Sequence, residues 1–184
     1  MADLYTHVLV GYTIGVVLSW RYEWLGYPFI AVVMAGAILP DLNRIELLLP
    51  AATIEAALGI PFSWSPLHRA GGTLVVVCLG TLLAAGRYRR AVFALLTIGA
   101  ASHYLLDFWL YKPSGVSGAL LWPFITDGFR IPGFYLSSDR WPAVVATVGA
   151  AVVWVVDRSW MNPGRSGRGS PDDPSTEEPE GPSR

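Results

Sequence analysis

The chain has 184 residues, 53% of them hydrophobic and only 15% charged, which excludes an ordinary soluble domain, where about 25% of residues are charged. The 13 basic residues nearly balance the 14 acidic ones and form no dense cluster beyond Arg87, Arg89 and Arg90, so we expect no nucleic-acid partner. The single cysteine, Cys78, excludes a disulfide framework and a Cys-rich metal site, so a metal site would have to use histidine and carboxylate ligands.

Five apolar segments of helical length follow one another along the chain. A bilayer hydrocarbon core of about 30 Å needs roughly 20 apolar residues in a helix, and these segments approach or reach that length. They comprise residues 4–20, 25–42, 71–85, 91–111 and 141–156. We therefore predict an all-α, polytopic helical membrane bundle of about five spans over residues 1–160, integral to the cell membrane and surrounded by the lipid bilayer.

The segments between and after these spans differ in composition. Residues 45–64 are apolar but interrupted by two glutamates and two prolines, which indicates an interfacial or re-entrant helix. Residues 114–138 are rich in glycine, proline and aromatic residues and suit a loop at the membrane interface. Residues 161–184 consist mostly of Pro, Gly, Ser and acidic residues, which cannot bury enough apolar surface to fold. We therefore predict a disordered C-terminal tail.

With five spans, the two ends of the chain lie on opposite sides of the membrane. The side away from the N-terminus receives seven basic residues, including the cluster at residues 87–90, whereas the N-terminal side receives five. Because short cytoplasmic loops are enriched in lysine and arginine, we expect the N-terminal face to lie outside the cytoplasm and the tail to lie inside it.

All three histidines and two of the aspartates fall at the N-terminal face in this topology. His7 opens the first span, Asp41 closes the second, and His68 precedes the third. His103 and Asp107 lie in the half of the fourth span that reaches the same face. Residues this polar are costly inside an apolar bundle and are functional-site candidates by default.

Each of these residues also has a simpler explanation. His103 and Asp107 are spaced i, i+4 and would meet on one helical face, where they could bind a common ion or merely hydrogen-bond to each other. Asp41 could cap a helix, and His7 alone would more often be an interfacial or core histidine. Taken together, these residues from four separate elements favour a shared metal site. Without thiolates the ligands suit Zn²⁺, Mn²⁺ or Fe²⁺, and we expect zinc or manganese.

Neighbouring residues extend this metal hypothesis to a reaction. Asn43 offers a further oxygen two residues after Asp41, and Arg69 could clamp an oxyanion together with the N–H groups from Gly71 onward. A metal ion that activates water, with Asp41 and Arg69 as catalytic residues, implies hydrolysis of a phosphoester or a related bond in a small molecule or a lipid-linked substrate. The alternative is a non-enzymatic membrane protein whose His/Asp cluster is structural or binds a ligand. A transporter or channel ranks last, because the valine-rich spans offer no polar path.

Four motifs in chain order resemble those of the YdjM-type family of predicted membrane-bound metal-dependent hydrolases. They lie within residues 1–125 and are Thr6-His7, Gly36-Ala-Ile-Leu-Pro-Asp41, His68-Arg69 before Gly-Gly-Thr73, and Ser102-His103-Tyr-Leu-Leu-Asp107. The resemblance implies a fold distantly similar to the all-helical zinc phospholipase C and single-strand nuclease group. It also implies the following metal ligands or catalytic groups: His7, Asp41, His68, His103 and Asp107.

The chain departs from the family pattern at two places. The family usually has a second aspartate where this chain has Asn43, and a second histidine where this chain has Thr73 and Leu74. These departures imply fewer metal ions, a different metal, or a protein that has kept the fold and lost the reaction.

Overall fold

The computed structural model describes residues 3–111, 120–123, 125–126 and 133–161, and this part of the chain is predominantly helical. The α-helices are, in order, α1 (Leu4–Arg21), α2 (Tyr27–Ile38), α3 (Ala51–Leu58), α4 (Ala70–Leu83), α5 (Arg89–Phe108) and α6 (Trp141–Val156). Shorter helical turns link or extend them: η1 (Leu39–Leu47), η2 (Ser65–His68), η3 (Gly86–Tyr88) and η4 (Asp157–Met161). The predicted all-α class is therefore confirmed for the described residues.

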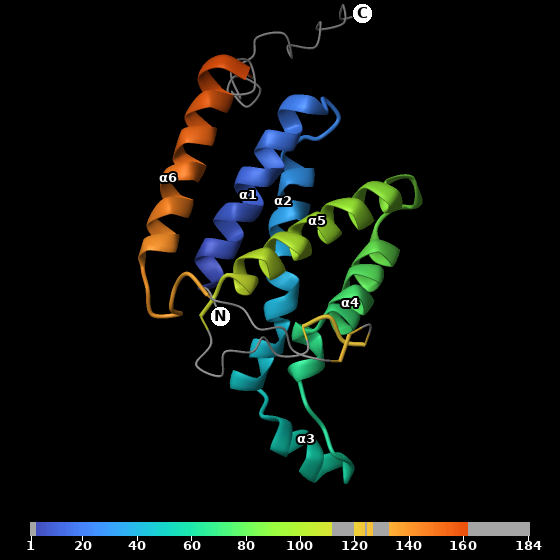
Figure 1. The fold of residues 1–184 in the computed structure, drawn as a ribbon. Helices are drawn as coiled ribbons and strands as arrows, with labels where there is room; N and C mark the ends of the chain where they lie inside the picture. The colour runs from blue at the N-terminus through green and yellow to red at the C-terminus, as the bar shows by residue number, and fades with distance from the viewer. Residues whose placement is uncertain (1–2, 112–119, 124, 127–132, 162–184) are drawn as a thin grey trace, which may run out of the picture.

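The helices α1 and α2 form an antiparallel pair at the centre of the bundle (Figure 1). Helix α5 packs against α2, α6 lies along α1, and α4 packs on α5. Helix α3 projects beyond the end of the bundle at which α2 ends (Figure 1). Buried apolar side chains from α1, the loop that follows it, α2 and α5 form the core: Val16, Leu25, Ile30, Val33 and Leu95.

Two glycines let α2 and α5 approach each other closely. A Cβ added at Gly99 would collide with the α2 backbone beside Ala37, and one added at Gly36 would collide with the backbone of Leu96 in α5. Small residues at helix crossings allow such close approach in membrane proteins. One turn after Gly99, this proximity brings the His103 Nδ1 atom to 2.9 Å from the Ala37 carbonyl oxygen.

Each of the five predicted spans overlaps one α-helix, but how many of these helices cross the membrane stays a prediction. Among the described residues, three helical stretches are long and apolar enough to do so: Tyr27–Leu47, Gly86–Phe108 and Trp141–Met161. Helix α4 has only 14 residues, about 21 Å at 1.5 Å per residue, which is shorter than a hydrocarbon core of about 30 Å. Helix α1 has 18 residues, several of them polar and buried, and is not among the three.

The segments predicted between and after the spans are described only in part. Within residues 45–64 the only α-helix is α3, and Gly59, which directly follows it, has the left-handed conformation with φ of 67°. The Trp64 indole nitrogen donates a 2.9 Å hydrogen bond to the Leu49 carbonyl oxygen, which joins the two flanks of α3. Much of the predicted interface loop, residues 114–138, and the predicted tail beyond Met161 lie outside the described residues.

Candidate metal centre

The five candidate ligands come together where four elements of the bundle meet. His7 lies in the first turns of α1, Asp41 in η1 and His68 at the end of η2, while His103 and Asp107 lie near the end of α5. All are almost completely buried except His68, whose side chain is 15% exposed. The structure thus places every predicted ligand in one cluster, which we call the His/Asp cluster.

The end of α2 explains how a carboxylate enters the interior. Pro40 has no N–H group for the Gly36 carbonyl oxygen, so the α-helix stops and the chain tightens into the turns of η1. Asp41 directly follows this change and is buried. One turn later, an Arg44 guanidinium nitrogen lies 3.0 Å from the Asp41 Oδ2 atom and forms an ion pair with this carboxylate.

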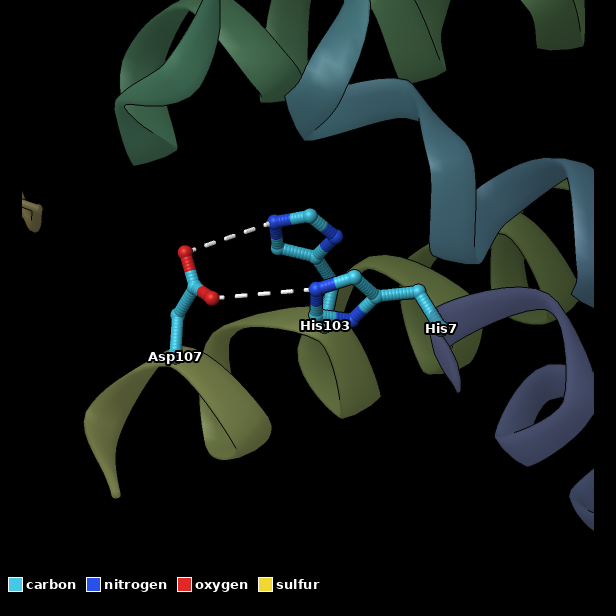
Figure 2. Close-up of side chains that lie close together, drawn as sticks. All are labelled: His7, His103 and Asp107. Atoms are coloured by element: carbon cyan, nitrogen blue, oxygen red, sulfur yellow. Dashed lines mark ion pairs between the residues drawn. The ribbon is translucent and has the colours of Figure 1, made fainter. Parts of the chain in front are cut away.

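The candidate ligand atoms form two overlapping triads that share His103. The first contains His7, His103 and Asp107, the second Asp41, His68 and His103, and within each the donor atoms lie within 4.8 Å of one another. Asp107 also connects the triads, because its Oδ1 lies 3.7 Å from His7 Nε2 in the first triad and its Oδ2 lies 3.1 Å from His68 Nε2 in the second. Figure 2 shows this carboxylate facing the imidazole rings of His7 and His103, which stack with centroids 3.8 Å apart.

Hydrogen bonds to the backbone define the tautomers of two histidines. His103 Nδ1 lies 2.9 Å from the Ala37 carbonyl oxygen, and His68 Nδ1 lies 2.9 Å from the Pro40 carbonyl oxygen. Since a carbonyl oxygen can only accept, both Nδ1 atoms carry hydrogen, and a neutral ring then presents an unprotonated Nε2 atom to the cluster. Protein metal sites orient their histidine ligands in this way.

Several buried polar atoms of the cluster have no hydrogen-bond partner among the described residues. They are both ring nitrogens of His7, Nε2 of His103 and Oδ1 of Asp41. Each unsatisfied buried atom costs about 1–3 kcal/mol. Two atoms that each lie about 2.0–2.2 Å from a tetrahedral zinc ion are roughly 3.3–3.6 Å apart. The separations of 3.1 to 3.8 Å between histidine nitrogens and carboxylate oxygens are close to this value, so the residues present fit a divalent cation.

His68 also has a second protonation state open to it. Its Nε2 atom faces Asp107 Oδ2 at 3.1 Å, and two such atoms attract each other only when a proton or a cation lies between them. Burial lowers the pKa of His68, but the hydrogen bonds to Asp107 and Pro40 and the charges of Asp107 and Asp41 raise it, and the net change is upward. This contact therefore suits either an imidazolium or a bound cation.

The start of α4 differs from the prediction of an anion-binding N-terminus. The backbone N–H groups of Ala70 and Gly71 donate to the carbonyl oxygens of Leu120 and Trp122 at 2.7 and 2.8 Å. The N–H group of Gly71 is therefore already engaged, and the prediction that it faces an anion is wrong. The guanidinium carbon of Arg69 lies 5.8 Å from the centroid of the Trp122 ring, and its role as an oxyanion clamp stays a prediction.

Two contacts around the cluster were missed at the level of sequence. Arg44 pairs with Asp41, and their i, i+3 spacing in a helical turn is the signal that could have revealed it. Thr73 is buried, and its Oγ1 atom donates to the Leu67 carbonyl oxygen at 2.9 Å and lies 2.6 Å from the Tyr104 hydroxyl. Thr73 thereby links η2, α4 and α5 behind the His/Asp cluster.

Asn43 is the other departure from the family pattern. Its Oδ1 atom is buried and has no hydrogen-bond partner within the described part of the chain. A ligand role for this oxygen stays a prediction.

Comparison with known proteins settles the family. The family model described as YdjM inner membrane protein matches residues 1–166. The chain belongs to the YdjM inner membrane protein family. The resemblance in its motifs is thus confirmed, and this YdjM protein is a multi-pass protein of the inner membrane. No curated protein and no solved structure matches the chain.

Proposed function

We propose that this YdjM protein is a membrane-bound metal-dependent hydrolase that acts on a phosphoester or a related bond. Zinc or manganese would be held by the residues of the cluster, which are His7, Asp41, His68, His103 and Asp107. The observation that carries the proposal is the convergence of buried nitrogen and oxygen atoms that lack hydrogen-bond partners among the described residues. Buried polar atoms in folded proteins are normally paired, so their convergence here supports a ligand that pairs them.

A bound divalent cation would supply Lewis acidity, which activates water for attack at neutral pH. The surrounding residues would orient the ligands, accept a proton and stabilise negative charge on the substrate. The carbonyl oxygens of Ala37 and Pro40 hold the rings of His103 and His68 in place. The Oδ1 atom of Asp41, which has no hydrogen-bond partner among the described residues, would take a proton from the attacking water.

Arg69 is the proposed stabiliser of negative charge on the substrate. It directly follows His68, the one cluster residue with appreciable exposure, so a substrate that approaches from solvent would meet both side chains. The Trp122 ring packs beside the guanidinium group and restricts its position. A guanidinium group can form two parallel hydrogen bonds to an oxyanion, which suits the charge that develops during phosphoester hydrolysis.

One contact favours the alternative of a non-enzymatic membrane protein with a structural cluster. The 3.1 Å approach of His68 Nε2 to Asp107 Oδ2, together with the Nδ1 bond to Pro40, fits an imidazolium that needs no metal. In that case the cluster would be an internal ion pair between α5 and η2. Metal analysis separates the two possibilities.

We expect the protein, purified in detergent without chelator, to contain stoichiometric zinc or manganese by elemental mass spectrometry. Removal of the metal should lower the melting temperature, because a ligand present at 100 times its dissociation constant stabilises the folded state by about 2.7 kcal/mol. Addition of zinc or manganese should restore it. If the protein carries no stoichiometric metal and cannot be loaded with any, the hydrolase proposal is wrong and the His/Asp cluster has a structural role.

Arg69→Lys should leave the metal bound and reduce phosphodiesterase turnover by roughly 10²-fold, as loss of one oxyanion-stabilising donor does. Lysine keeps the charge but lacks the planar pair of donors. The matched control is Arg87→Lys in η3, where the guanidinium carbon lies 4.6 Å from the centroid of the Tyr88 ring. Equal turnover in the two variants, with metal content unchanged in both, would remove Arg69 from the mechanism.

A further inference from the structure

A cavity of about 500 Å³ lies beside the His/Asp cluster, where α1, α5 and α6 meet the segment at residues 134–135. Two of its lining residues, Thr6 and Leu106, directly precede His7 and Asp107 in the sequence. The cavity wall therefore includes the residues that directly precede two candidate metal ligands. Its other walls include Trp109, Phe134 and Ala146.

The lining of this cavity is almost entirely apolar, and its volume lies in the range of about 300–1,000 Å³ that holds small ligands. Water gains few hydrogen bonds in such a space, so an apolar occupant is favoured. The chain is an inner membrane protein, and α6 is one of its candidate membrane spans. Around α6, the apolar groups at the highest local concentration are therefore the hydrocarbon chains of lipids.

One lining residue of the cavity, Thr6, carries a buried polar atom. Thr6 lines the cavity and is almost fully buried, yet its Oγ1 atom has no hydrogen-bond partner among the described residues. Such a hydroxyl is normally paired. The hydroxyl group of Tyr135, another lining residue, already donates to the Leu106 carbonyl oxygen at 2.7 Å. Thr6 is thus a lining residue of the cavity whose buried hydroxyl group is unpaired within the described part of the chain.

We propose that the cavity holds one hydrocarbon chain of a membrane lipid and thereby places the lipid's phosphoester group at the His/Asp cluster. The inference rests on the proposed hydrolase function and narrows its substrate class to lipid-linked phosphoesters. In the hydrolysis that follows, the water oxygen bonds to phosphorus, the phosphorus–oxygen bond to the leaving alcohol breaks, and one water proton ends on that alcohol.

The test uses the full-length protein in phospholipid vesicles that contain a small fraction of a phospholipid with a photoreactive diazirine in one acyl chain. After irradiation, the modified residues are mapped by mass spectrometry in the presence of chelator, so that chain binding is read without turnover. We expect saturable labelling of Val10 and Leu106. Ala146→Phe, which fills the cavity from α6, should reduce this labelling by roughly tenfold, the change that about 1.4 kcal/mol of lost binding produces.

A second pair of variants keeps the test decisive if Ala146→Phe folds poorly. Val144 and Val145 are neighbours in α6 and are both 60% exposed, but only Val145 lines the cavity. Val145→Trp should also reduce labelling of Val10 and Leu106, whereas Val144→Trp should leave it unchanged. Labelling that is equal in the filling and control variants, or restricted to outward-facing residues of α6, would overturn the proposal.

The proposed function can fail independently of this inference. Absence of bound metal would remove the hydrolase, whereas the labelling experiment in chelator would still report whether the cavity takes a lipid chain. Conversely, a metal-loaded hydrolase whose cavity is not labelled would act on a substrate outside the lipid class.

Discussion

Asp107→Asn should abolish stoichiometric metal binding while leaving much of the protein folded. Asp107 is the residue that joins the two triads of the cluster, since its carboxylate oxygens face His7, His68 and His103 at 3.1 to 3.7 Å. Loss of a partner that merely orients a ligand costs about 10–100-fold in metal affinity, and loss of a charged ligand should cost more. Elemental analysis and competition with a chromophoric chelator measure the change.

The matched control is Asp157→Asn. Asp157 lies in η4, beside the C-terminal end of α1, whereas His7 lies near the N-terminal end of α1. Asp157 is also buried, and its Oδ1 atom accepts a 3.0 Å hydrogen bond from the Trp20 indole nitrogen. This substitution removes a buried negative charge without touching the His/Asp cluster, so metal content should stay at the wild-type level. If Asp107→Asn instead keeps its metal and mainly lowers the folded yield, the cluster is a structural polar network that has lost a charged partner.

Gly99→Leu should cause the largest loss of stability of the variants considered. Even a Cβ atom at this position would collide with the backbone of α2, so the two helices would have to separate. Overpacking of a close interface costs typically 1–3 kcal/mol, and we expect about 3 kcal/mol here because backbone rather than flexible side chain is in the way. The melting temperature in detergent and the yield of monodisperse protein report this loss.

Gly149→Leu provides the control for an added side chain on a membrane helix. No atom among the described residues lies within 4 Å of a Cβ added at Gly149, so this variant should melt like the wild type. Separation of α2 from α5 should also break the hydrogen bond between His103 and the Ala37 carbonyl and lower metal content. Equal melting temperatures for the two variants would show that the close contact of α2 and α5 does not stabilise the fold.

The apolar runs of the sequence were sufficient to locate the helices. Residues 141–156 were predicted as a span and form α6 with the same bounds, and residues 4–20 differ from α1 only at its last residue. Transfer of a segment into an apolar environment depends mainly on its own composition, so each helix can be recognised locally. The number of spans cannot be read from each segment alone, because neighbouring helices in the bundle can accommodate a helix as short as α4.

The cluster could be anticipated for a similar reason. Counting spans assigns each polar residue to a membrane face, and the predicted common face of three histidines and two aspartates was informative because the spans contain few polar residues. The same counting could not give distances. The stacked rings of His7 and His103 depend on where α1 crosses α5, and the tautomer of His103 depends on the glycines that bring α2 within hydrogen-bond reach.

Only the tertiary structure decided which groups were already paired. The N–H group of Gly71 appeared available in the sequence, but a carbonyl oxygen of Trp122, 51 positions later, accepts its hydrogen. The cavity beside Thr6 likewise arises from three helices that are distant in sequence. Hydropathy and helical spacing indicate the preference of each segment for lipid. Hydrogen-bond partners and cavities depend instead on which segments cross and how closely they approach, and no local sequence pattern encodes that crossing.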